Sequence, residues 1–136
     1  MKTYVSPMPS TKQAQAANFD ERIRAWRTQT EQGHYEESLH SSYDAYLDAE
    51  DWDNALLQIL LMENHVIPKY GKNSCEYATV LFKKGQLFKR ACNCNEDRIE
   101  AMGLLIQSKK LYEQFGLKYS ECWKCCMEEI NELIEN

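Results

Sequence analysis

Helix breakers are rare in this chain, and their scarcity restricts its fold more than any other feature. Among 136 residues, proline occurs only as Pro7, Pro9 and Pro68, and there are five glycines. A β-rich fold needs frequent turns, which draw heavily on these two residue types. The sequence therefore predicts an all-α protein.

Apolar residues recur every three or four positions through most of the chain, which is the pattern of amphipathic helices. Two predicted helices are apolar on two sides, which indicates burial between neighbours. Asn95 is the predicted N-cap of one helix, and Gly33 and Gly116 are predicted stops. Helices are predicted over residues 18–32, 34–49, 51–68, 74–92, 95–115 and 120–136.

The chain is expected to hold one folded domain. Residues 1–17 are polar, contain two prolines and lack a helical period, so we expect a flexible tail there. Residues 18–136 are numerous enough to bury a core without help from metals or disulfides.

Composition excludes several classes of protein. The net charge of −5 argues against a general nucleic-acid binder. No apolar run approaches the roughly 20 residues that span a membrane, and the N-terminal stretch MKTYVSPMPS lacks the apolar segment of a signal peptide. We therefore expect a cytoplasmic or nuclear protein whose six cysteines are reduced.

Two junctions in the chain resemble each other. Tyr70-Gly71 and Phe115-Gly116 each lead through a short polar linker into a new helix. The repeated unit runs from one aromatic-Gly junction to the next. A unit of that length, built from helix pairs, is typical of helical solenoids. The small residues Ala55, Gly85 and Ala101 stand where tetratricopeptide hairpins pack closely. The prediction is about six antiparallel helices stacked as tetratricopeptide-like hairpins, with a plain six-helix bundle as the alternative.

Three stretches carry a family resemblance: DWDNAL (51–56), VIPKYGKNSCEYATVLFKKGQL (66–87) and EAMGLLIQSKKLYEQFG (100–116). Together with the final helix they resemble the C-terminal helical region of the SET and MYND domain lysine methyltransferases. Kinesin-light-chain-type tetratricopeptide repeats share the looser aromatic-Gly features. The resemblance covers residues 46–135.

This resemblance implies a regulatory domain that packs over a substrate cleft and contributes to protein contacts. The catalytic SET core and the cysteine-rich MYND finger of the family have no counterpart in the chain. S-adenosylmethionine and the family's zinc ions belong to those parts. The resemblance therefore implies the non-catalytic C-terminal module of such an enzyme, and a free-standing adaptor that binds a peptide is the alternative.

The residues themselves predict no active site. His34, His40 and His65 stand beside no nucleophile motif, and the chain has neither a phosphate-binding glycine loop nor an H-E-x-x-H motif. We expect no catalytic residue, no cofactor and no metal within this chain.

A peptide groove is the more promising site. In stacked hairpins the first helix of each pair lines the concave side, and Lys83, Lys89 and Arg90 are predicted to hold a carboxylate or an acidic peptide there. The alternative is that these are ordinary surface charges without a binding role. The predicted partner-binding residues are Phe82, Lys83, Gln86, Lys89 and Arg90 of helix 74–92, with His40 and Asp44 of helix 34–49.

The cysteines form a pattern that zinc sites also use. Cys92 and Cys94 are followed about thirty positions later by Cys122 and Cys125, as C-x-C and C-x-x-C. The helix predicted between them is roughly 25 Å long at ~1.5 Å per residue. The two pairs are therefore expected at opposite ends of that helix, too far apart for one ion, and Cys126 is expected in the core.

Overall fold

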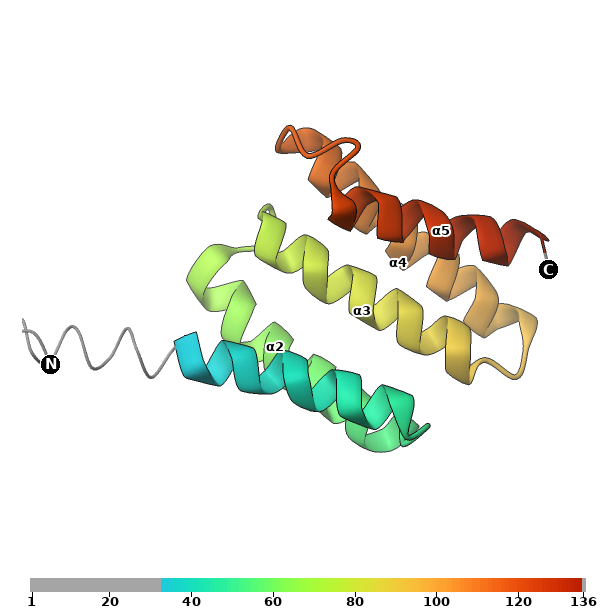
Figure 1. Cartoon of the computed structure of the whole chain (residues 1–136), viewed down its shortest axis with the longest axis horizontal. Coiled ribbons are helices and arrows are strands. Elements are labelled where there is room, and N and C mark those ends of the chain that lie inside the picture. The colour runs from blue at the N-terminus through green and yellow to red at the C-terminus, as the bar shows by residue number, and fades with distance from the viewer. Residues whose placement is uncertain (1–32, 136) are drawn as a thin grey trace, which may run out of the picture. The chain divides into compact units, whose positions relative to one another are not determined.

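The computed structural model describes residues 33–135, and the regular secondary structure in that range is helical. Residues 33–48 are helical, and residues from Leu39 onward form one compact unit. Within this unit consecutive helices run antiparallel (Figure 1). The all-α prediction is confirmed for this part of the chain, whereas the predicted tail 1–17 and helix 18–32 lie outside the described residues. The further helices are α2 (Trp52–Tyr70), α3 (Cys75–Ala91), α4 (Asn95–Gln114) and α5 (Glu121–Glu135).

The predicted helix stop at Pro68 and the predicted N-cap at Asn95 are wrong by two residues and one residue. α2 continues through Pro68 to Tyr70 instead of stopping at the proline. Pro68 lies exposed in the last turn, so its missing backbone N–H removes a helix hydrogen bond only close to the helix end. Asn95 is the first residue of α4, and the N-cap is Cys94, whose side chain makes no capping hydrogen bond. Glu96 and Asp97 supply the negative charge that favours this helix end.

The two aromatic-Gly junctions end their helices by the same backbone device. Gly71 and Gly116 have φ values of 82° and 76°, a left-handed conformation that favours glycine. The Gly71 N–H donates to the carbonyl of Ile67, and the Gly116 N–H donates to that of Glu113 at 3.1 Å. The predicted stop at Gly116 is confirmed, whereas Gly71 replaces Pro68 as the end of its helix, and Gly33, the other predicted stop, is itself helical.

α3 is the central helix of the unit, because it packs against α2, α4 and α5. Its Val80 and Leu87 join a core with residues 39–48 and α2. Its Phe82 and Phe88 pack against a second core between α4 and α5. The first core consists of Leu39, Tyr43, Leu47, Ala55, Ile59, Met62, Val66, Val80 and Leu87, and the second of Ala101, Leu105, Ile130 and Leu133.

α3 and α4 approach each other closely at Gly85. A Cβ atom at this position would lie 2.8 Å from the Leu105 Cγ and 3.2 Å from the Ala101 carbonyl oxygen. Gly85 and Ala101 are therefore the small residues of this contact, as their sequence positions predict. Gly103 is also helical, but a Cβ atom at this position would have no neighbouring atom within 4 Å.

These two glycines provide a matched test of the packing. Gly85→Ala is expected to lower the free energy of unfolding by about 1–3 kcal/mol, because the added methyl group overpacks the contact. Gly103→Ala is expected to raise it by about 0.5–1 kcal/mol, because alanine has the higher helix propensity and meets open space. Urea unfolding followed by circular dichroism measures both. Equal stabilisation by the two substitutions would contradict the close approach of α3 and α4.

Candidate functional site

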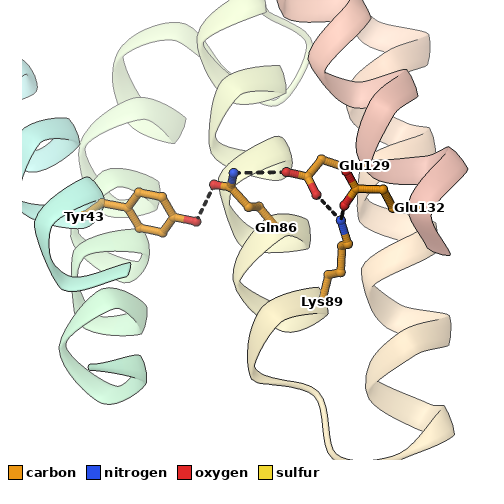
Figure 2. Close-up of polar contacts among 5 residues, drawn as sticks. All are labelled: Tyr43, Gln86, Lys89, Glu129 and Glu132. Atoms are coloured by element: carbon orange, nitrogen blue, oxygen red, sulfur yellow. Dashed lines mark hydrogen bonds and ion pairs between the residues drawn. The ribbon is translucent and has the colours of Figure 1, made fainter. Parts of the chain in front are cut away.

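A chain of polar contacts crosses the face made by residues 39–48, α3 and α5 (Figure 2). Tyr43 is fully buried, and its hydroxyl lies 2.7 Å from the Lys83 carbonyl and 3.0 Å from the Gln86 Oε1, to which it donates. The Gln86 Nε2 donates to Glu129 at 3.1 Å. Gln86 thus connects the first of these helices to α5. Burial raises the pKa of Tyr43, so its hydroxyl remains a proton donor.

Lys89 completes this network on α3. Its Nζ pairs with both Glu129 and Glu132 of α5. Burial disfavours the charged lysine, but the hydrogen bonds that Lys89 donates to the two carboxylates outweigh burial and raise its pKa. The hydrogen bond from Lys89 lowers the pKa of Glu132. At neutral pH Lys89 and Glu132 are therefore charged, and the ion pairs of Lys89 hold α3 against α5.

A second lysine of α3 is paired on the other side. The Lys83 Nζ lies 3.3 Å from the Asp44 Oδ1 and 5.0 Å from the centre of the Tyr43 ring. The side chain of Lys83 is 14% exposed and that of Asp44 is 65% exposed. The pair of Lys89 and Glu132 is similar: the side chain of Lys89 is 13% exposed and that of Glu132 is 61% exposed. In these two pairs the acidic side chain is the more exposed partner, whereas Glu129, the other partner of Lys89, is 12% exposed.

The structure therefore brings together four of the predicted site residues: Asp44, Lys83, Gln86 and Lys89. The prediction assumed that the two lysines are free cations. Both are already paired with carboxylates of neighbouring helices, which argues against a carboxylate clamp built from them. Those acidic partners lie on other helices, so the pattern of α3 alone did not reveal them.

The remaining predicted residues lie in different surroundings. Phe82 is half-buried and packs against Ala101, Leu105 and their neighbours in the second core. Arg90 is exposed and lines a shallow hollow with Leu47, Asp48, Glu50 and Trp52. His40 is half-buried, one helical turn before Asp44.

Sequence reasoning missed a pocket between α3, α4 and the start of α5. Its volume is about 210 Å³ and its accessible lining is apolar. The Thr79 Oγ1 and the Tyr112 Oη on its wall lie 2.7 Å apart and bond to each other. Because three separate helices supply its walls, no local sequence pattern marks it. The lining residues are Thr79, Phe82, Lys83, Tyr112, Glu121, Cys122 and Cys125.

The cysteines of the zinc-like pattern lie in two separate places. Cys92 and Cys94 flank the turn before α4, whereas Cys122 and Cys125 lie in the first turns of α5. α4, with 20 residues, is about 30 Å long and separates the pairs. Among residues 33–135 no group of three or more His, Cys, Asp or Glu residues is arranged to hold a metal ion.

Cys126 belongs to the core, as predicted. It is fully buried, and its Sγ lies 3.4 Å from the Ser108 Oγ. Burial raises the pKa of Cys126 to about 11, although the hydrogen bond with Ser108 acts in the opposite direction. Ser108 in turn donates to the Ala78 carbonyl at 2.6 Å, so this polar pair is satisfied within the core.

Comparisons with known proteins assign no family to this arrangement. No protein-family profile matches the chain, and no curated protein and no solved structure is significantly similar to it. Across the helices of the described range, none is long and apolar enough to cross a membrane.

The Lys89 network provides a test of stability. Lys89→Met is expected to lower the free energy of unfolding at pH 7 by about 1–2 kcal/mol, because the partly buried Glu129 loses its cation. Lys124→Met is the matched control, because Lys124 and Glu121 lie 3.9 Å apart and are 54% and 89% exposed. That substitution is expected to change stability by no more than about 0.5 kcal/mol. Urea unfolding measures both.

The same network predicts a pH dependence. The pKa of Glu132 is lowered in the folded state from its usual value of 4.5. The stability that its ionised form contributes is therefore present above about pH 4.5 and lost as the pH falls through the folded-state pKa. Lys89→Met is expected to flatten this acid limb in unfolding experiments from pH 7 to pH 3. An unchanged acid limb would contradict the pairing.

Thiol labelling tests the placement of the cysteines. Cys94 and Cys122 are exposed and are expected to react with a maleimide in the folded protein at rates that neither zinc nor a chelator changes, because they lie at opposite ends of α4. Cys126 is expected to react only after denaturation, because it is buried. Mass spectrometry of labelled peptides gives each rate. Joint protection of Cys94 and Cys122 by one equivalent of zinc would overturn this placement.

Proposed function

We propose that residues 39–135 form a tetratricopeptide-like helical-repeat domain that binds a protein or peptide partner. In this view residues 39–48 pair with α2, α3 pairs with α4, and α5 opens a third unit. First helices of successive pairs lie beside one another in such stacks. The observation that carries the proposal is the Tyr43–Gln86–Glu129 chain of hydrogen bonds, which connects the three helices that would be first in their pairs.

The shared face suits binding better than catalysis. Polar side chains of this face are held in place by ion pairs and by hydrogen bonds of a side-chain amide. They are Asp44, Lys83, Gln86, Lys89 and Glu129. Side chains that are already ordered lose less conformational entropy when a partner binds. The apolar pocket beside Lys83 adds a place where a partner side chain loses contact with water.

The resemblance to the SET and MYND domain methyltransferases supports a more specific form of this proposal. The DWDNAL stretch opens α2, with Asp51 as its N-cap, and Gly85 and Ala101 meet at the α3–α4 contact. The domain would then be the non-catalytic C-terminal module of such an enzyme, acting in the cytoplasm or nucleus on access to the catalytic cleft. A SET core encoded in the same transcript supports this form, and a transcript without one supports a free-standing adaptor.

Site-specific crosslinking tests the proposed face. A photoreactive amino acid at Asp44 or Glu132 places the probe at the exposed ends of the network. A probe at Glu100, which is exposed on α4, is the matched control because α4 does not contribute to this face. We expect the first two positions to capture the same partner in cell extract and Glu100 not to capture it. Equal capture from all three positions would contradict the proposal.

A further inference from the structure

We propose that the pocket between α3, α4 and α5 and the carboxylates beside it form one binding site for a basic peptide segment that inserts a single apolar side chain. This inference rests on the proposed function and specifies the chemistry of the partner. The partner proposed here is basic, whereas the sequence pattern of α3 suggests an acidic one.

The pocket provides the apolar part of the site. A cavity of about 150 Å³ is large enough for a benzene ring, and this pocket has about 210 Å³ and an open mouth. It therefore has room for a leucine, methionine or phenylalanine side chain. The hydroxyls of Thr79 and Tyr112 bond to each other, so they leave little demand for a polar ligand. Burial, and then the nearby Glu128 and Glu121, raise the pKa of Cys125, so this thiol is neutral.

Carboxylates flank the pocket on two sides. Glu121 lines the pocket, and its side chain is 89% exposed. Lys83 also lines the pocket, but its charge is paired with Asp44, which is the more exposed partner at 65%. A ligand side chain in the pocket would thus have a carboxylate from α5 on one side and one from residues 39–48 on the other.

The same sign of charge continues along α5. Glu132, whose side chain is 61% exposed, pairs with Lys89, whose side chain is 13% exposed. Lys124 is an exposed cation that lies 3.9 Å from Glu121, and Arg90 lies in a separate hollow with Asp48 and Glu50. In the ion pairs of this side the exposed carboxylates of Asp44, Glu121 and Glu132 therefore outnumber the exposed cation of Lys124. Complementary charge favours a lysine- or arginine-rich segment and disfavours an acidic one.

Synthetic peptides test both parts of the inference. The probes are labelled heptapeptides of lysine and arginine with leucine, methionine or phenylalanine at the centre. One matched control has alanine at the centre, and another keeps the apolar residue but replaces the basic residues with glutamate. Fluorescence anisotropy at 150 mM salt, with the whole chain, measures binding. At least one basic peptide with an apolar centre is expected to bind about tenfold more tightly than both controls.

Two variants of the protein locate the binding. Cys122→Phe places a ring at the pocket and is expected to weaken binding about tenfold, whereas Cys94→Phe, exposed at the other end of α4, is expected to leave it unchanged. The double variant Asp44→Lys, Glu121→Lys is expected to weaken binding by a similar factor. Circular dichroism and urea unfolding check that each variant is folded.

Three results would overturn the inference: absence of binding by every basic peptide, equal binding of the apolar-centred and alanine-centred peptides, or tighter binding of the acidic peptide. The crosslinking experiment separates this failure from failure of the proposed function. Partner capture from Asp44 and Glu132 without peptide binding means that the face is used but that the partner has another chemistry. Loss of both signals rejects the proposed function as well.

Discussion

The close approach of α3 and α4 at Gly85 is the contact on which the rest of the unit depends. Because residue 85 has no side chain, α4 lies against the backbone of α3, with Leu105 and Ala101 filling the contact. α3 is then in place to present Val80 and Leu87 to one core and Phe82 and Phe88 to the other. The side of α3 that remains carries Lys83, Gln86 and Lys89, spaced three residues apart. The candidate site is therefore a consequence of how α3 is packed.

Pairing across helices decides the electrostatic character of this face. Three polar residues of α3 meet partners that are 39 or more positions away: Asp44 and Tyr43 on one side, and Glu129 and Glu132 on the other. In the Lys83–Asp44 and Lys89–Glu132 pairs the acidic side chain is more exposed than the lysine side chain. A stripe that looks basic in sequence thus presents negative charge to solvent. This inversion is the reason that the proposed partner is a basic segment and not an acidic one.

The cysteine pattern shows a similar separation between sequence and space. Cys92, Cys94, Cys122 and Cys125 have the spacing of a zinc site, but α4 lies between the two pairs. Cys126 serves the core through Ser108, and Cys122 and Cys125 line the apolar pocket. The role of each cysteine in this unit therefore follows from the residues around it. The spacing of the cysteines in the sequence does not show which of them lie close together.

The sequence by itself determined the helices of residues 33–135 and located their ends to within about two residues. Helical periodicity, Gly116 as a stop and the small residues at the α3–α4 contact are local properties, because helix hydrogen bonds and positive φ values depend on near neighbours in the chain. Its errors were also local: Pro68 is tolerated in the last turn of α2, and Cys94 replaces Asn95 as the cap. Only the tertiary structure decided which charges pair, which faces turn toward water and where the pocket opens. These properties depend on distances between residues of different helices, and such distances are set by packing and not by the order of residues along one helix.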